Sequence, residues 1–473
     1  MKTFLQPLQN LAEMEEIQKQ AKKNRGILEI SGCMESQKAH LMYGLSGLFP
    51  CHLVIAADEK SAKELYEDYR FYDKRVYYYP AKDLLFFQAD IHGNLLIRQR
   101  MQVIRALLER EDEITVVTSI DGCMDYLVPL EKIEKQLIHF RNDSTLDMDK
   151  LTAALVHMGY ERVGQVEMPG QFSIRGGIID IYSLTEENPW RIELWGDEID
   201  SIRSFDAQSQ RSLENLDEVT IYPAAEQPME KNGVSFLDYF KETETLFFLD
   251  ELNHLEENAK AVQEEFQQSC ENRKEKGEIS LSGDWMCTWE ELCHKINDRN
   301  CVAMSLLDPK KSNWKISGQF NITVKSMSSY QSSFELLVKD LKQYKKEGYQ
   351  IVLLSGSRTR AERLAKDLQE EGLNAFYGQD SDRILQPGEI MVAYGHARRG
   401  FEYPLVKFAV ITETDIFGKE QKKRKKKKEY NGKRIQDFSE LSIGDYVVHE
   451  KHGLGIYKGI EKVAVDKVAK DYI

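Results

Sequence analysis

Short apolar runs alternate with longer amphipathic stretches through the first quarter of the chain. The runs Gly26–Ile30, Leu53–Ala57 and Ile114–Thr118 are mostly apolar or β-branched and too short for helices, so they predict buried strands. Between them, Glu59–Tyr72 and Leu95–Leu108 repeat apolar residues at helical spacing. Strands separated by helices of this length predict a parallel α/β sheet.

The pattern changes to a period of two after residue 150. A helix is predicted at Met148–Met158, because Gly159 follows its last turn. Downstream, alternate residues are apolar in four segments, which predicts antiparallel strands at Phe172–Arg175, Ile178–Tyr182, Arg191–Trp195 and Ile199–Phe205. The apolar run Leu246–Leu249 then predicts that the α/β sheet resumes, so the segment between is an inserted α+β domain.

A second α/β pattern follows, and after it a small β pattern. The second α/β unit is predicted from one helix and three strands, at Arg358–Glu371, Ile351–Leu354, Ile390–Ala393 and Phe408–Thr412. The predicted boundaries are an α/β domain at 1–120 that resumes at 213–303, an insertion at 121–212, a second α/β domain at 304–417, a linker at 418–436 and the start of a small SH3/Tudor-like β module at 437–473.

Charge is distributed unevenly over the 473 residues. The chain carries a formal charge of -14, yet Lys419–Arg434 holds ten Lys and Arg against two Glu. Like charges at this density repel one another and cannot be buried, which favours a flexible linker. The same segment could contact nucleic-acid phosphates, but charge alone carries no readout of sequence or shape. A linker is the favoured interpretation.

Composition indicates a folded intracellular protein. With 41% apolar and 10% aromatic residues, most of the chain can form cores, which excludes a wholly disordered protein. The sequence lacks the roughly 18 consecutive apolar residues of a membrane span and lacks a secretory signal. Seven cysteines without a CxxC pair favour reduced thiols over a disulfide or zinc framework. We therefore expect a cytoplasmic protein without a membrane partner.

The first strand-to-helix turn lies where an NTPase would carry its phosphate loop. That loop needs G-x-x-x-x-G-K-[ST], because the second glycine admits the phosphates, Lys binds them and the hydroxyl holds Mg²⁺. Here the turn retains Gly32 and Lys38, but Gln37 replaces the second glycine and Ala39 replaces the hydroxyl residue. On these residues alone an ordinary strand-turn-helix is favoured over a nucleotide site.

Other chemical motifs are equally weak. Asp250 and Glu251 follow an apolar strand, as do the acids that position Mg²⁺ and water in NTPases, but such a pair after a strand is common. His449 and His452 lie near a predicted β-turn rather than on one helix face, so a metal site is disfavoured. We predict no catalytic residue, no metal site and no ATPase activity for this chain alone.

The inserted domain instead presents a candidate binding surface. Alternation places Arg191, Glu193 and Trp195 on one strand face, and Arg175 lies on a neighbouring predicted strand. Arg and Trp are enriched at binding hot spots, which favours an interface. Equally, Arg175 could pair with a local carboxylate such as Asp180 while Trp195 covers an edge of its own domain. The pattern leaves both interpretations open.

Several longer motifs resemble those of one protein family. The segments 168–182, 191–206 and 209–212, which begin Met-Pro-Gly-Gln-Phe, Arg-Ile-Glu-Leu-Trp and Ser-Gln-Arg-Ser, are similar to the UvrB-type interaction module. The segment 443–457, Ile-Gly-Asp-Tyr-Val-Val-His-Glu-Lys-His-Gly-Leu-Gly-Ile-Tyr, resembles the CarD-like polymerase-binding module. The region 76–108, with Tyr79-Pro80 and Asp83-Leu-Leu, fits the same family. Together and in this order, they resemble the bacterial transcription-repair coupling factors.

The resemblance implies a fold and two protein partners. The first α/β domain would be a degenerate UvrB/RecA-like domain that has lost its ATPase motifs. The insertion would recruit UvrA, with Arg175, Arg191 and Trp195 at matching contact positions and Glu193 on the same face. The last module would bind the RNA polymerase β subunit, and its family motif covers Gly444, Asp445, Val448, His449, His452, Gly453 and Gly455.

The family's motor is an ATP-driven translocase on double-stranded DNA that displaces stalled RNA polymerase at lesions. ATP and Mg²⁺ belong to that motor, so no cofactor is expected in this chain, which lacks the motor motifs. We therefore expect an N-terminal part with an incomplete polymerase module, and DNA contacts through the motor or the basic linker. Two alternatives are an independent UvrB-like ATPase or helicase and a CarD-like transcription regulator.

Overall fold

A seven-stranded sheet forms the centre of the protein in the computed structural model. The structure describes residues 1–23, 25–82, 94–111, 113–226, 233–275, 286–308, 314–378, 382–418, 444–449, 453–457, 461–465 and 468–472. All neighbouring strands of the central sheet are parallel. Their order is β17 (Ile316–Asn321), β1 (Gly26–Ser31), β16 (Asn300–Ser305), β15 (Thr245–Asp250), β2 (Cys51–Ala56), β4 (Ile114–Ser119) and β3 (Val76–Tyr79). The predicted parallel α/β sheet is confirmed.

Helices cover both faces of this sheet, which is why its inner strands are mostly apolar. One face packs against α1 (Lys2–Gln9), α2 (Met14–Lys23), α3 (Glu35–Ser46) and α4 (Glu59–Tyr69). The other face packs against α5 (Asn94–Leu108), α8 (Leu252–Glu275) and α9 (Trp289–Asn297). No helix among the described residues is both long enough and apolar enough to cross a membrane.

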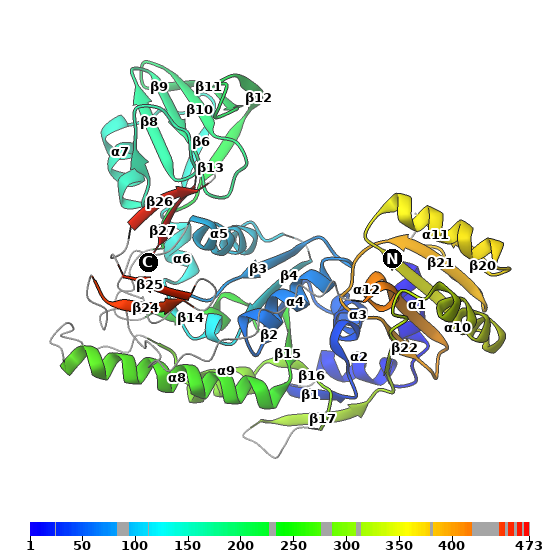
Figure 1. The fold of residues 1–473 in the computed structure, drawn as a ribbon. Helices are drawn as coiled ribbons and strands as arrows, with labels where there is room; N and C mark the ends of the chain where they lie inside the picture. The colour runs from blue at the N-terminus through cyan, green and yellow to red at the C-terminus, as the bar shows by residue number, and fades with distance from the viewer. Residues whose placement is uncertain are drawn as a thin grey trace.

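The insertion is an α+β domain that projects from the body beyond α5 (Figure 1). Its six-stranded sheet has the order β12 (Ser212–Leu216), β11 (Glu198–Phe205), β10 (Trp190–Trp195), β9 (Ile178–Ile181), β8 (Gln171–Arg175) and β7 (Glu161–Arg162). Helix α7 (Met148–His157) packs on one face together with the two-stranded antiparallel sheet of β6 (Ile138–Arg141) and β13 (Glu218–Ile221). The opposite face, which we call the outer face, carries the residues predicted for binding.

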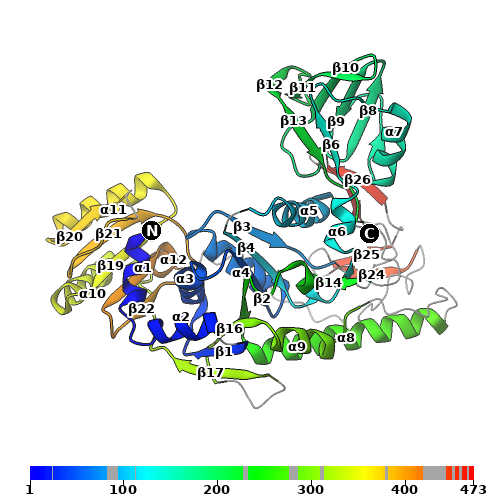
Figure 2. The ribbon, with the colours of Figure 1, turned by 180° about the vertical axis from the view of Figure 1, so that it is seen from behind.

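Short elements join the insertion to the body. Strand β5 (Tyr126–Leu127) pairs with β14 (Val234–Ser235), and α6 (Leu130–Glu134) leads into the insertion. We call these connecting elements the neck of the insertion. Near the neck, the Arg100 side chain of α5 is fully buried. It binds Glu226, Asp125 at 3.2 Å and the Pro80 carbonyl at 2.8 Å. Because Asp125 lies before β6 in the chain and Glu226 lies after β13, Arg100 ties both connections of the insertion to α5. Seen from behind, the same neck separates the insertion from the central sheet (Figure 2).

The second α/β unit has a mixed sheet. Its order is β18 (Lys325–Ser326), β22 (Phe401–Tyr403), β23 (Phe408–Thr412), β19 (Gln350–Ser355), β21 (Glu389–Tyr394) and β20 (Asn374–Tyr377). The last four strands are parallel, and the accompanying helices are α10 (Phe334–Glu347), α11 (Arg358–Glu370) and α12 (Glu413–Phe417). Phe401, Tyr403 and Phe408 lie in the same apolar core as Phe4 of α1. The second unit is therefore continuous with the first.

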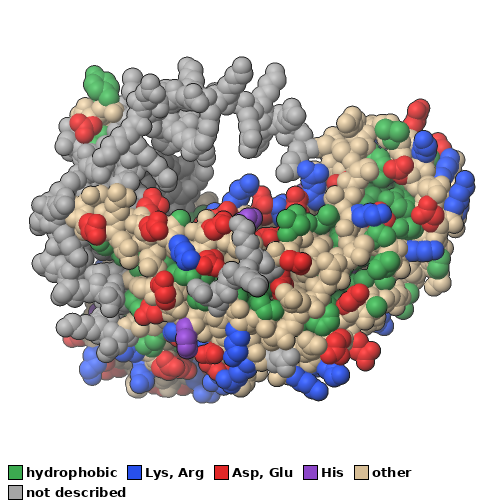
Figure 3. Space-filling model, turned by 90° about the horizontal axis from the view of Figure 1, so that it is seen from below, with side chains coloured by type: hydrophobic (Ala, Val, Ile, Leu, Met, Phe, Trp, Pro, Cys, Tyr) green, Lys and Arg blue, Asp and Glu red, His purple; other side chains and the backbone are tan. Residues whose placement is uncertain are grey.

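Two hairpins represent the small β module among the described residues. Strand β24 (Tyr446–His449) pairs with β25 (Gly453–Ile456), and β26 (Glu461–Val465) pairs with β27 (Val468–Tyr472). The predicted basic linker beyond Gly418, the predicted motif residues Asp83-Leu-Leu and the predicted module residue His452 lie outside the described residues. On the face in Figure 3, acidic and basic side chains are interspersed over the described residues, so that face does not carry a field of one sign.

Candidate functional site

Strand register places the predicted contact residues of the insertion in adjacent rows on its outer face. One row crosses four strands through Asp180, Arg191, Arg203 and Asn215. The next row runs through Arg175, Ile178, Glu193 and Ser201. Trp195 lies at the end of β10, opposite Glu198 of β11. Side chains in adjacent rows of one sheet face are within reach of one another.

Arg175 and Arg191 converge on the buried carboxylate of Asp180. The Nε and Nη2 of Arg191 donate to the two Asp180 oxygens at 2.7 and 2.9 Å, and Nη2 of Arg175 donates to Oδ2 at 2.5 Å. The Arg191 guanidinium also lies 4.4 Å from the centre of the Phe205 ring and donates to Gln210 at 3.0 Å. The local salt bridge with Asp180 therefore exists, and it involves both arginines.

The two remaining predicted residues, Glu193 and Trp195, differ in their contacts. Glu193 accepts from Arg203 and from the Ser201 hydroxyl, so its charge is neutralised within the sheet. Trp195 is 84% exposed. The alternative in which Trp195 covers an edge of its own domain is therefore wrong. The outer face presents one large aromatic side chain beside an internally paired set of charges.

The turn between β1 and α3 has the place of a phosphate loop but different contacts. Gly32 adopts φ +81°, and a Cβ there would come within 2.3 Å of the Ile322 carbonyl oxygen, so this glycine serves chain packing. The Gln37 side chain caps α3 by accepting from the Met34 N–H at 3.0 Å and donates to the Tyr403 hydroxyl at 2.9 Å. Ala39 is fully buried in the core.

Lys38 is bound by the two acids that follow β15. Its Nζ donates to Asp250 and Glu251, each at 2.6 Å, and its side chain is 7% exposed. Burial alone would lower the pKa of Lys38, but the two carboxylates raise it above its usual value. Burial raises the pKa of Asp250. The lysine that would bind phosphate in an NTPase thus has two carboxylates of this chain as partners.

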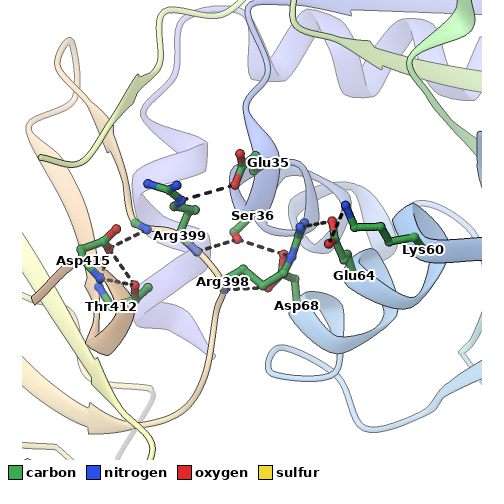
Figure 4. A network of polar contacts seen from close by, with 10 residues as sticks. Glu35, Ser36, Lys60, Glu64, Asp68, Arg398, Arg399, Thr412 and Asp415 are labelled. Carbon is green, nitrogen blue, oxygen red and sulfur yellow. Dashed lines mark hydrogen bonds and ion pairs between the residues drawn. The ribbon is translucent and has the colours of Figure 1, made fainter. Parts of the chain in front are cut away.

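An arginine of the second unit reaches this same region of the first unit (Figure 4). Arg398 donates from its Nε and its backbone N–H to Asp68, both at 2.9 Å, and its Nη1 binds Glu64. Asp68 also accepts from the Ser36 hydroxyl of α3 at 2.9 Å. The side chain of Arg398 is 19% exposed and that of Asp68 is fully buried, so this bridge lies inside the contact between the two units.

Arg399 is arranged differently from its neighbour. Its backbone N–H donates to Ser36 at 3.1 Å, while its guanidinium lies 3.8 Å from Glu35 and its side chain is 45% exposed. A cleft of about 450 Å³ opens between the two units at this point, lined by residues of both, including Lys38 and Glu251. The cleft has acids and bases already in contact with one another, so it does not present a free cationic cradle for phosphates.

The polymerase-module residues are described only in part. Gly444 has φ +109°, and backbone bonds of 2.8 Å link Gly444 to Tyr457 and Tyr457 to Asp445. Val448 and His449 lie on β24 and Gly453 and Gly455 on β25, with His449 opposite Gly453. No cluster of His, Cys, Asp or Glu able to hold a metal ion occurs among the residues that the structure describes.

Sequence reasoning missed three residues of these sites. The bridge from Arg398 to Asp68 has no local signal, because the two residues lie 330 positions apart in the sequence. Tyr403, which accepts from Gln37, lies 366 positions away in the sequence. Gln210 carried no chemical signal in its loop. For Arg191, the alternation that puts Asp180 on the same sheet face was the available signal.

The described fold defines a class: an α/β protein with an inserted interaction domain of the UvrB type. The family described as "UvrB interaction domain" matches residues 138–226, and the family described as "CarD-like/TRCF RID domain" matches residues 441–473. The first match spans the elements from β6 to β13 and contains Asp180 and both arginines bound to it.

The chain is similar to transcription-repair-coupling factors. It is 31% identical to that of Bacillus subtilis (strain 168), over 94% of this chain and 44% of the relative. It is 28% identical to that of Staphylococcus haemolyticus (strain JCSC1435), over 84% of this chain and 39% of the relative. These matches confirm the resemblance that the motifs indicated, and the chain spans less than half the length of these relatives.

Solved structures add no argument beyond this. A yeast Dbp5 chain, solved bound to Nup159, Gle1, IP6 and ADP, covers 83% of this chain and 76% of its own, with 8% identity and a TM-score of 0.23. That score is too low to support an inference about either arrangement or function.

Proposed function

We propose that this chain links nucleotide excision repair to transcription. Its interaction domain recruits UvrA by mimicking UvrB, and the module matched at 441–473 contributes to binding of the RNA polymerase β subunit. In a longer protein, motor domains using ATP and Mg²⁺ would translocate on double-stranded DNA and displace stalled polymerase at lesions. We place this activity in the cytoplasm, where UvrA and RNA polymerase act on bacterial DNA.

One observation carries the UvrA assignment. Trp195 is 84% exposed on the outer face of the domain that matches the UvrB interaction family. A large indole left in water beside ordered arginines is typical of a binding hot spot, because its burial in a partner's pocket removes much apolar surface from water. Arg175, whose side chain is 45% exposed, supplies a charged donor on the same face.

Replacing Trp195 with alanine should weaken binding to purified UvrA more than tenfold and leave the melting temperature unchanged. Truncating a hot-spot aromatic costs about 2 kcal/mol or more of binding free energy. The fold loses little, because the side chain contacts mainly solvent. Calorimetric or surface-based titration of UvrA with both proteins measures the affinity, and differential scanning calorimetry measures the melting temperature.

Leu213→Ala is a matched control for this substitution. Leu213 is also apolar and 56% exposed, but it lies on another strand, β12. The strand register places it beside the C-terminal end of β11, whereas Trp195 lies beside the N-terminal end. It should bind UvrA within twofold of the unmodified chain. Equal affinity of the Trp195→Ala and unmodified proteins for UvrA would refute the assignment of the outer face.

We further propose that the chain neither binds nor hydrolyses ATP. Support comes from Lys38, whose ammonium group is occupied by Asp250 and Glu251, and from Gln37, whose side chain caps the helix where phosphates would lie. Isothermal titration with Mg-ATP should give no binding in the micromolar range. A micromolar dissociation constant would overturn the proposal and favour an independent UvrB-like ATPase.

A further inference from the structure

We propose that Asp180 is a positioning residue, which holds the Arg175 guanidinium in the orientation that meets an acidic group of the partner. The inference rests on the proposed function, because it concerns the same outer face. It divides the two arginines by role: Arg175 contacts the partner, and Arg191 holds Asp180 in place.

The burial and contacts of Asp180 support the positioning role. Its side chain is 1% exposed, so it cannot itself reach a partner. Both of its oxygens are used, Oδ1 by Arg191 and Oδ2 by Arg191 and Arg175 together. A buried carboxylate with three charge-assisted donors has little freedom to rotate. The atom that receives Arg175 is therefore fixed within the sheet.

The surroundings of Arg191 make it an unsuitable contact residue. Its side chain is only 15% exposed, and its guanidinium is held by Asp180, by Gln210 and by the ring of Phe205. By contrast, the Arg175 side chain is 45% exposed, and Asp180 is the protein partner that the described structure gives its guanidinium. Of the two arginines that bind Asp180, Arg175 therefore has the more exposed side chain.

The net charge of the residues around Asp180 on the outer face favours an acidic group on the partner. One carboxylate, Asp180, faces two arginines, so this group keeps a positive charge, whereas Glu193 and Arg203 neutralise each other. A carboxylate of the partner fits the exposed Arg175 side chain, because a guanidinium group binds planar anions through parallel hydrogen bonds. Holding the arginine in advance reduces the side-chain entropy that binding would otherwise cost.

A double-mutant cycle separates positioning from mere stability. The variants are Asp180→Asn, Arg175→Ala and their combination, each titrated with purified UvrA and each melted alone. Asparagine keeps the shape of the side chain but removes its negative charge and turns an amide NH2 group toward one arginine. We expect Asp180→Asn to weaken UvrA binding about tenfold in the unmodified chain and less than twofold in the Arg175→Ala chain. The melting temperature of each variant shows whether a loss of binding follows from a loss of the fold.

The outcomes distinguish this inference from the function on which it rests. If Asp180→Asn weakens binding equally in both backgrounds, or not at all, Asp180 does not act through Arg175 and the inference is wrong. If Trp195→Ala binds UvrA normally, the outer face is not the UvrA site and the proposed function fails first.

A second variant tests the inference if Asp180→Asn does not fold. Arg191→Lys keeps a cation beside Asp180 but loses the pair of parallel hydrogen bonds that orients it. It should weaken UvrA binding severalfold in the unmodified chain and leave binding unchanged in the Arg175→Ala chain. An equal loss in both backgrounds would instead mean that Arg191 contacts UvrA directly.

Discussion

Replacing Arg100 with alanine should lower the free energy of unfolding by roughly 3–5 kcal/mol, the usual cost of breaking a buried ion pair from one side. Arg100 has no exposed surface, and its loss leaves Glu226 and Asp125 buried without their guanidinium partner. It also removes the guanidinium that lies 4.2 Å from the centre of the Tyr79 ring. Urea denaturation followed by circular dichroism measures the loss.

Arg105→Ala is the matched control on the same helix. Arg105 pairs with Glu109 and Glu186, but its side chain is 34% exposed, so water can replace its contacts. Its removal should cost less than about 1 kcal/mol, as for most surface ion pairs. Equal losses for the two variants would contradict a special role of Arg100 at the neck of the insertion.

The Arg100→Ala substitution should also change how the free energy of unfolding depends on pH. Burial alone would raise the pKa of Glu226, but Arg100 and Lys82 hold it at about 2, below the ordinary value of 4.5. Ionised Glu226 therefore stabilises the fold above pH 4.5, and this contribution is lost as the pH falls from 4.5 toward 2. In Arg100→Ala this part of the acid dependence should shrink, which urea titrations between these pH values would measure.

Arg398→Ala should destabilise the contact between the two α/β units by roughly 2–4 kcal/mol, since it leaves a buried carboxylate unpaired. Asp68 is fully buried and would keep only the Ser36 hydroxyl and the residue 398 backbone N–H as donors. Hydrogen exchange should rise in β22 and α4 before it rises in the central strands.

The neighbouring residue provides the control for this substitution. Arg399 is 45% exposed and lies 3.8 Å from Glu35, so Arg399→Ala should cost less than about 0.5 kcal/mol. If both variants lost the same stability, the bridge from Arg398 to Asp68 would not hold the units together.

The element pattern of this protein could be predicted from its sequence. The strands around Leu53, Ile178 and Ile351 are recognisable from their apolar residues. These residues are consecutive in strands of the buried parallel sheets and alternate with polar residues in the insertion. The insertion was recognisable for the same reason, since the period changes twice. These are local signals, and the side chains of a few consecutive residues are enough to produce them.

The departure from the phosphate-loop motif was also visible in the sequence, because Gln37 and Ala39 stand at positions where the chemistry of phosphate binding admits few residue types. The motifs of the insertion likewise identified the family without a structure. The contacts that Lys38 makes instead were not visible. The partners of Lys38 lie more than 200 positions away, and only the order of strands in the sheet brings them to its side.

Local pattern thus determined the kinds of elements, the motifs of the modules and the departure from the phosphate-loop motif. The tertiary structure alone decided which charges meet: Lys38 with Asp250, Arg398 with Asp68, and both arginines of the outer face with Asp180. The physical reason is that apolar periodicity depends on neighbours along the chain, whereas a buried charge needs a partner in space. The topology of the sheets supplies that partner from a distant strand, helix or loop.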